Sequence, residues 1–426
     1  MMIAWFFLAV SLIGAWLTYN VYRPHYVSGR LALLSFVTGW LTGELALHHI
    51  AWQVLATLFF VWEGALDHAA GRLALWISVA SWIGLGLAYF RGGSAAAAIE
   101  GALREAFGAD YRVQVRPELA SRFREAVDWK EIAQPFPMRH PDVERIRDIG
   151  YWRVRGINLK LDVYRNRSCP GGCPVLFEIH GGGWIVGSKN EQGIPLMLRM
   201  ARQGWVCVSA DYRLSPHATF PDHLVDLKKA LAWIREHIAE YGGDPDFVVV
   251  AGQSAGGHLA SLVALTANQP EYQPGFAELD TSVSGCVSFY GVYDFTDRHK
   301  LWPNPEIAKL LEEKVMKASC DEDRAAYEKA SPMSAISAAA PPFLIIHGDR
   351  DTLAPVTEAR RFAADLRSLS RSPVAYAELA GAQHAFEIFP SLRGELVLGG
   401  VERFLALLYS RYLARREERT SLSAAG

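Results

Sequence analysis

FVVVAGQSAG, at residues 247–256, carries an apolar run directly into a GxSxG motif. A continuous apolar run of this kind is typical of a strand that is buried on both faces of a sheet. Glycines on both sides of the serine allow the sharp strand-to-helix turn that exposes a nucleophilic hydroxyl, and the helix that follows favours negative charge at its N-terminus. We therefore expect Ser254 to be a nucleophile at the carboxyl end of a buried strand. A chance match to the motif is the alternative, and the preceding strand disfavours it.

Short β-rich runs alternate with helical periods through most of the chain after residue 145. Strands are expected at 150–155, 158–164, 174–180, 205–210, 247–252, 284–290, 343–347 and 374–379. Between two of them, 222–241 follows a proline and places five apolar side chains on one helical stripe: Leu224, Leu227, Leu231, Ile234 and Ile238. Alternating strands and helices predict an α/β fold with a mostly parallel sheet of eight strands, whose ligand site lies at the carboxyl ends of the strands.

A second glycine-rich motif, His180-Gly181-Gly182-Gly183-Trp184, follows the expected strand 174–180. Glycine lets the main chain approach a ligand closely, so such a loop can direct backbone N–H groups at a developing oxyanion. Gly182, Gly183 and Ala255 are the expected donors. A plain glycine-rich turn and a phosphate loop are the alternatives, and the second is disfavoured because the GxxxxGK[ST] pattern is missing.

A serine hydroxyl needs a base to take its proton, and an imidazole that does so needs a carboxylate to orient it. His384 lies in the loop after the last expected strand, and the segment HGDRDTLAP at 347–355 ends the strand before it. The order Ser, Asp, His is that of α/β-hydrolases. Asp349 and Asp351 compete for the acid role; we favour Asp351, because its place in the loop is the one that turns back towards the histidine, and expect Asp349 in a surface turn.

The first 90 residues differ in composition from the rest, since they contain only six Asp, Glu, Lys or Arg side chains. Residues 2–19 form an uncharged apolar run long enough to cross a bilayer, and no basic segment or cleavage site marks it as a signal peptide. Residues 73–90 supply another such run. The apolar stretch 31–66 is too long for one span and predicts a tight helical hairpin.

Two questions about this region stay open in the sequence. Four spans are expected and three are the alternative; because Arg23 and Arg30 favour a cytoplasmic first loop, four crossings would export the catalytic part and three would keep it inside. Glu44, His48 and His49 interrupt the apolar stretch, which a hairpin turn at headgroup level explains more simply than a polar cavity. Gly39 and Gly43 have GxxxG spacing and are expected to pack within the chain.

Charge and cysteine content exclude several classes of protein. A formal net charge of −2 gives no basic face for nucleic acid. The five cysteines are too few for a disulfide scaffold and lack metal-ligand spacing. The expected serine, histidine and aspartate chemistry needs no metal or organic cofactor. Cys169 and Cys173 flank a Pro-Gly-Gly turn. The sequence does not decide whether they form a disulfide or are two free thiols.

The motifs together resemble the hormone-sensitive-lipase-like branch of the α/β-hydrolases. They are HGGGW at 180–184, DYRLSP at 211–216, GQSAGGH at 252–258, HGDRDTLAP at 347–355 and QHAF at 383–386. EYGGDPD at 240–246 and FYGVYDF at 289–295, behind several apolar segments, are similar to membrane-anchored carboxylesterases of the mycobacterial type and, more distantly, to isoprenylcysteine methylesterases. Gln253 and His217 depart from the acidic residues common in this branch, which puts substrate preference in doubt rather than activity.

The resemblance implies a membrane-anchored serine carboxylesterase that acts on short- to medium-chain or lipid-like esters. An acyltransferase with the same triad and an inactive hydrolase fold serving as a membrane interaction module are the alternatives. Trp184 and Tyr212 are expected at the substrate pocket, and Asp211 and Arg213 are expected to form a structural pair. The expected parts are a transmembrane region at 1–90, a connector contributing to the cap at 91–145, a catalytic domain at 146–415 with a cap insertion at 293–340, and a flexible tail at 416–426.

Overall fold

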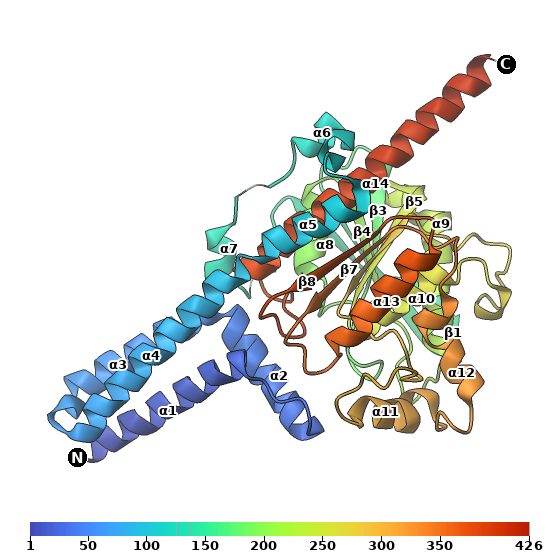
Figure 1. The fold of residues 1–426 in the computed structure, drawn as a ribbon. Coiled ribbons are helices and arrows are strands. Elements are labelled where there is room, and N and C mark those ends of the chain that lie inside the picture. Colours follow the sequence, from blue (N-terminus) through green and yellow to red (C-terminus); the bar gives the residue numbers. More distant parts are fainter. Residues whose placement is uncertain (125, 137, 426) are drawn as a thin grey trace.

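A computed structural model describes residues 1–124, 126–136 and 138–425. Pro137, in the proline-broken run that the sequence places at the end of the connector, lies outside the described residues. An elongated helical bundle at the N-terminus projects from an α/β domain (Figure 1). Its helices are α1 (Met2–Tyr22), α2 (Gly29–Glu44), α3 (Ala46–Trp62) and α4 (Ala69–Gly92).

The α/β domain is built on the predicted eight-stranded sheet, in the order β1-β2-β4-β3-β5-β6-β7-β8. The antiparallel pairs are β1 with β2 and β2 with β4, and the remaining neighbours are parallel. All eight strands coincide with predicted ones, although β1 begins earlier than expected. Their bounds are β1 (Val143–Val154), β2 (Ile157–Asn166), β3 (Cys173–Ile179), β4 (Val206–Ala210), β5 (Gly243–Gln253), β6 (Gly285–Phe289), β7 (Phe343–Gly348) and β8 (Val374–Leu379).

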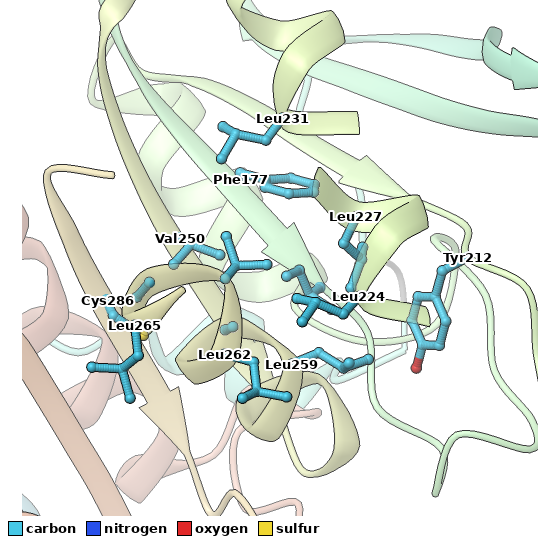
Figure 2. Close-up of a cluster of buried hydrophobic side chains, with 14 of the residues drawn as sticks. Phe177, Tyr212, Leu224, Leu227, Leu231, Val250, Leu259, Leu262, Leu265 and Cys286 are labelled. Carbon is cyan, nitrogen blue, oxygen red and sulfur yellow. The ribbon is translucent and has the colours of Figure 1, made fainter. Parts of the chain in front are cut away.

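Helices cover both faces of the sheet, because residues along the central strands alternate between two apolar layers. In β5, Val248 and Val250 face one layer, whereas Val249 and Ala251 face the other. The first layer contains α9 (Asp222–His237), α10 (Ala255–Leu265) and α13 (Val356–Leu369), and Figure 2 shows side chains of α9 and α10 packed against β3 and β5. The predicted stripe of α9 lies entirely in this layer. The second layer contains α5 (Ala95–Phe107), α8 (Ile194–Arg202) and α14 (Leu392–Ala425).

The remaining short helices lie in connections. α6 (Pro117–Ala120) and α7 (Trp129–Ala133) belong to the segment between α5 and β1, and α11 (Glu306–Leu310) and α12 (Arg324–Lys329) belong to the insertion between β6 and β7. At the other end of the chain, α14 continues as helix through 416–425, where the sequence predicts a flexible tail.

The N-terminal helices have an inside-out arrangement of side chains. Small and hydroxyl residues of α1 and α4 meet between the helices, where Ser11 and Ser78 lie 2.9 Å apart and Thr18 and Ser81 lie 2.7 Å apart through their hydroxyl oxygens. Large apolar side chains point outward instead: Trp5, Phe6, Leu12, Ile13 and Trp16 of α1, and Leu73, Trp76, Ile83, Leu87 and Phe90 of α4. Small residues inside and apolar residues outside are typical of helices surrounded by lipid.

By length and hydropathy, α1 and the helix containing α4 could each cross a membrane, and the bent pair of α2 and α3 could supply a third crossing. The predicted tight hairpin is therefore wrong, because α2 and α3 meet at 86° and do not run antiparallel. The reason lies at the bend, where Glu44 is buried in an ion pair with Arg393 of the α/β domain. Glu44 therefore does not mark a turn exposed at headgroup level. Gly39 packs within the chain as expected, against Asn20 of α1.

Cys169 and Cys173, at the loop before β3, are free thiols in the structure. Their sulfur atoms lie 3.1 Å apart, which is hydrogen-bonding rather than covalent distance.

Candidate active site

Ser254 stands at the predicted turn between β5 and α10. Its φ of 57° and ψ of −121° are strained for a residue with a side chain, as expected of a nucleophile on such a turn. The flanking glycines are required sterically: a Cβ atom at Gly252 would lie 2.2 Å from the carbonyl oxygen of Gly256, and one at Gly256 would lie 2.0 Å from that of Ile179. From residue 247 to residue 266 every residue is buried except Ser254, which is half-buried. The turn therefore presents one side chain only.

Asp351 and His384 lie in contact as predicted, with 2.6 Å between Asp351 Oδ2 and His384 Nδ1. The other carboxylate oxygen accepts hydrogen bonds from the N–H groups of Leu353 and Ala354, both at 2.8 Å. Burial acts to raise the pKa of Asp351, but the charge of His384 and hydrogen bonds from His347 and His384 outweigh it and hold this pKa well below its usual range. The carboxylate stays ionised and fixes the histidine ring.

Two neighbours stabilise this pair. The side-chain oxygen of Gln383 accepts hydrogen bonds from the N–H groups of Thr352 at 2.8 Å and His384 at 2.9 Å, and so joins the two loops. Asp349 instead accepts a hydrogen bond from the N–H of Gly381 at 2.7 Å. Asp349 therefore stabilises a turn, whereas Asp351 contacts the histidine, as predicted.

Ser254 and His384 line the same cavity, whose volume is about 210 Å³. Among the described residues, the Ser254 hydroxyl has no hydrogen-bond partner, so the predicted bond to His384 is not formed in this structure. Catalytic hydrogen bonds are often long or poorly aligned without substrate and tighten when it binds.

The loop at 180–187 has the backbone geometry that its glycines predict. Gly182 has a φ of 108° and Gly183 a φ of 59°. A Cβ atom at Gly182 would lie 2.0 Å from the carbonyl oxygen of Val186, so only glycine fits there. Gln192 anchors the loop by accepting a hydrogen bond from the N–H of Gly181 at 2.6 Å. Gly183 lies in the cavity lining beside Ser254.

Of the two aromatic residues expected at the pocket, Trp184 lines the cavity and Tyr212 does not. Tyr212 lies behind the glycine loop, where its ring stacks on His180 with 4.4 Å between ring centroids. Its hydroxyl donates to the carbonyl oxygen of His180 at 3.1 Å. The tyrosine therefore supports the loop instead of bordering the pocket. Arg213 likewise pairs with Asp226, not with the expected Asp211, which accepts from the N–H of Lys189.

The cap over the cavity differs from the predicted one. The insertion between β6 and β7 contributes as expected, through Asn304, Glu306, Ile307 and Leu310, but none of the described residues in 91–145 lines the cavity. Helix α5 instead packs against β8 and α14 through its buried apolar residues, such as Ile99 and Leu103. Gly29 and Ala32 of α2 take that place.

A cluster of buried polar side chains lies beside His384. Tyr290 packs its ring against His384, with centroids 4.4 Å apart, and its hydroxyl donates to Glu387. Glu178 accepts a hydrogen bond from Ser209 at 2.9 Å. Burial raises the pKa of Glu178 to about 8 and that of Glu387 to about 7. Glu178 is therefore mostly protonated at neutral pH, whereas Glu387 is about half protonated there.

These raised pKa values predict how stability changes with pH. The folded chain binds protons at Glu178 that the unfolded chain loses above pH of about 4.5, so stability is fully present below that pH and falls as pH rises towards 8. Glu178 should therefore stabilise the protein less at pH 8 than at pH 5, and Glu178→Gln should remove this part of the pH dependence of the melting temperature. Thermal unfolding in detergent across that range measures it. The exposed Glu118, changed to Gln, should leave the slope unchanged; an equal slope in wild type and Glu178→Gln would contradict the assignment.

A sheet of this topology, with a half-buried serine in a strained turn after β5, an Asp–His pair after β7 and β8 and a glycine loop after β3, defines an α/β-hydrolase. The BD-FAE family model matches residues 161–366. The chain is 41% identical over 423 residues to the probable carboxylic ester hydrolase LipM of Mycobacterium tuberculosis, covering 96% of this chain and 95% of the relative. It is 39% identical to the esterase LipQ of the same organism, over 76% of this chain and 78% of the relative.

Solved structures agree with these relatives. Esterase 2 of Thermogutta terrifontis, phosphonylated by sarin, superposes with a TM-score of 0.51 at 26% identity and covers 59% of this chain and 88% of its own. The chain belongs to the hormone-sensitive-lipase-like family of carboxylesterases. It is a carboxylic ester hydrolase.

Proposed function

We propose that the protein is a membrane-anchored serine carboxylesterase that works through an acyl-enzyme, with Ser254, His384 and Asp351 as its triad. One observation carries this proposal: the buried Asp351–His384 pair opens into the cavity that also contains the strained, half-buried Ser254. The pairing of Asp351 with His384 leaves the other ring nitrogen, Nε2, for the serine proton.

In the proposed reaction, the Ser254 oxygen attacks the ester carbonyl while His384 takes the hydroxyl proton. The N–H groups of Gly182, Gly183 and Ala255 stabilise the negative charge on the carbonyl oxygen. His384 then gives its proton to the leaving alcohol as the carbon–oxygen bond breaks. Water, deprotonated by the same histidine, attacks the acyl-enzyme and releases the acid and the serine.

The inside-out side-chain pattern of α1 and α4 supports membrane anchoring. The arrangement of the bundle supports a proposal of three crossings, by α1, α3 and α4: α1 ends beside the catalytic domain, where the Tyr22 carbonyl accepts a hydrogen bond from Arg350, and α4 runs back towards it (Figure 1). Arg23, Arg30 and Arg91 lie at this end of the bundle. The positive-inside rule then places the catalytic domain in the cytoplasm.

A fluorophosphonate probe tests the proposal. The related Thermogutta esterase is phosphonylated by sarin, and the same chemistry here should modify Ser254. Full-length protein in detergent should take up one probe per chain, located at Ser254 by peptide mass spectrometry, and lose aryl ester hydrolysis in proportion. Modification of another serine, or hydrolysis that survives complete labelling, would refute the triad.

A further inference from the structure

Helix α2 belongs by sequence to the apolar N-terminal region, yet one of its faces is part of the catalytic site. The carbonyl oxygen of Ala32 accepts a hydrogen bond from the Thr352 hydroxyl at 3.0 Å, next to the triad acid. The ring of Phe36 meets His384 edge-on, with ring centroids 5.7 Å apart. The helix therefore contacts both loops that carry the acid and the base.

The C-terminal half of α2 is fastened to the segment that follows His384. Trp40 stacks on Phe389 with centroids 5.1 Å apart. Glu44 forms a buried ion pair with Arg393 and accepts a hydrogen bond from the Ser391 hydroxyl at 2.8 Å. A buried pair of this kind holds its geometry closely, because separating the partners leaves an uncompensated charge. The whole length of α2 is thus fixed over the active site.

The opposite face of α2 is apolar and exposed. Between Arg30 and Glu44 the helix has no charged residue. Apart from Glu44, its fully buried residues are small or carry a hydroxyl, namely Ala32, Ser35, Gly39 and Thr42, and Phe36 and Trp40 are partly buried beside them. Its exposed side chains are large, with exposed fractions of 48% for Leu31, 55% for Leu33, 45% for Leu34 and 39% for Val37.

Lipid is the environment that fits this exposed face. The face has the same inside-out pattern as α1 and α4, and α2 lies at the end of the bundle formed by these helices (Figure 1). The angle of 86° between α2 and α3 sets α2 across the direction of the bundle. If α3 runs along the membrane normal, α2 lies in the plane of the interface with Leu34 and Val37 in the acyl chains.

The catalytic cavity reaches the surface at the beginning of α2. Gly29 and Glu306 both line it, and Glu306 is exposed. Val27 and Leu31, on either side of Gly29 in the chain, are exposed apolar residues, with 73% and 48% of their surface accessible. The mouth of the cavity is therefore next to the surface that we assign to the membrane.

A second cavity of about 250 Å³ adjoins the first. It shares Asn304, Ile307, Thr352 and Leu353 with the catalytic cavity and extends to Tyr26 in the loop between α1 and α2. The lining of the catalytic cavity is largely apolar, as in its Val292, Ile307 and Leu310. Two adjoining cavities suit an ester with two sizeable arms, one on each side of the scissile bond.

We infer that the enzyme takes esters dissolved in the bilayer, which enter its site from the membrane plane beside α2. This inference rests on the proposed serine esterase function and specifies its substrate class: esters with a long apolar arm that partition into lipid. The helix serves two purposes, since its inner face closes the catalytic cavity and its outer face keeps the cavity mouth at the level of the lipid.

The test compares two esters with one leaving group. Full-length protein is reconstituted in phosphatidylcholine vesicles and given 4-methylumbelliferyl acetate from water or 4-methylumbelliferyl palmitate within the vesicles. The double variant Leu34→Ser, Val37→Ser should hydrolyse the palmitate about tenfold more slowly, because two apolar contacts with lipid are lost. Hydrolysis of the acetate should be unchanged, which also shows that the variant is folded.

The control changes two apolar residues of α4 that are even more exposed, Ile83→Ser and Leu87→Ser, which lie outside the cavity lining. A selective loss in the α2 variant supports the inference. Equal losses in both double variants, or no loss in either, overturn it while leaving the esterase function intact. Ser254→Ala measured with the acetate reports on the proposed function separately: acetate hydrolysis that persists in this variant refutes the triad, whatever the α2 variant does.

Discussion

Ser254→Ala should lower the turnover of an aryl ester by roughly three to six orders of magnitude without unfolding the protein. The oxygen that attacks the carbonyl is lost, and the oxyanion donors alone give only residual rate enhancement. The change removes one atom from a half-buried side chain with no hydrogen-bond partner among the described residues, so the free energy of unfolding should change little.

Assays of aryl ester hydrolysis by purified protein in detergent measure the turnover, and circular dichroism checks that the variant is folded. Ser261→Ala is the control, because this serine lies in α10, the helix that begins after Ser254, and its hydroxyl donates to the Gly257 carbonyl and contacts Ser288 away from the cavity lining. The control should retain wild-type activity within a few-fold. Near-normal turnover in purified Ser254→Ala would reject the serine as nucleophile.

Asp351→Asn should lower kcat by about four orders of magnitude. Asparagine keeps the size of the side chain but loses the negative charge, and its amide no longer requires a proton on Nδ1 of His384. The ring can then adopt the tautomer that cannot accept the serine proton. Because the carboxylate also accepts hydrogen bonds from His347 and two backbone N–H groups, some loss of stability should accompany the loss of rate.

Asp349→Asn is the comparison that decides between the two aspartates. Asp349 contacts the Gly381 N–H and not the histidine, so its variant should keep most of the activity at neutral pH. Both variants are assayed at saturating ester across pH 5–9. The reverse result, an inactive Asp349→Asn and an active Asp351→Asn, would exchange their roles.

The fold and the catalytic centre were predictable because their signals are local. Each strand of the sheet is a short apolar run, and the spacing of Leu224, Leu227 and Leu231 predicts the buried face of α9. The strained turn at Ser254 needs glycines at fixed positions in sequence. The choice of Asp351 over Asp349 also followed from position within one loop.

The cap could not be predicted in the same way, because its contacts join distant parts of the chain. Ala32 meets Thr352 across more than three hundred residues, and Glu44 finds Arg393 across a similar separation. Within the sequence, Glu44 is only a charge in an apolar stretch. The row of small residues at helical spacing on α2 indicates that one face of this helix is packed. It does not indicate which part of the chain packs against that face. Tyr212 was misplaced for a related reason, since its expected place at the pocket came from the resemblance, whereas its contact with His180 joins two separate loops.

The ion pair between Glu44 and Arg393 has a practical consequence for producing this enzyme. A shortened, water-soluble chain that starts after residue 90 would lack Gly29 and Ala32 and would leave the guanidinium of Arg393 without its buried partner. Such a protein could still cleave small activated esters. Its preference among acyl chains would differ from that of the full chain, because α2 would no longer cover the cavity. Inhibitor screening against that fragment would select for the wrong shape.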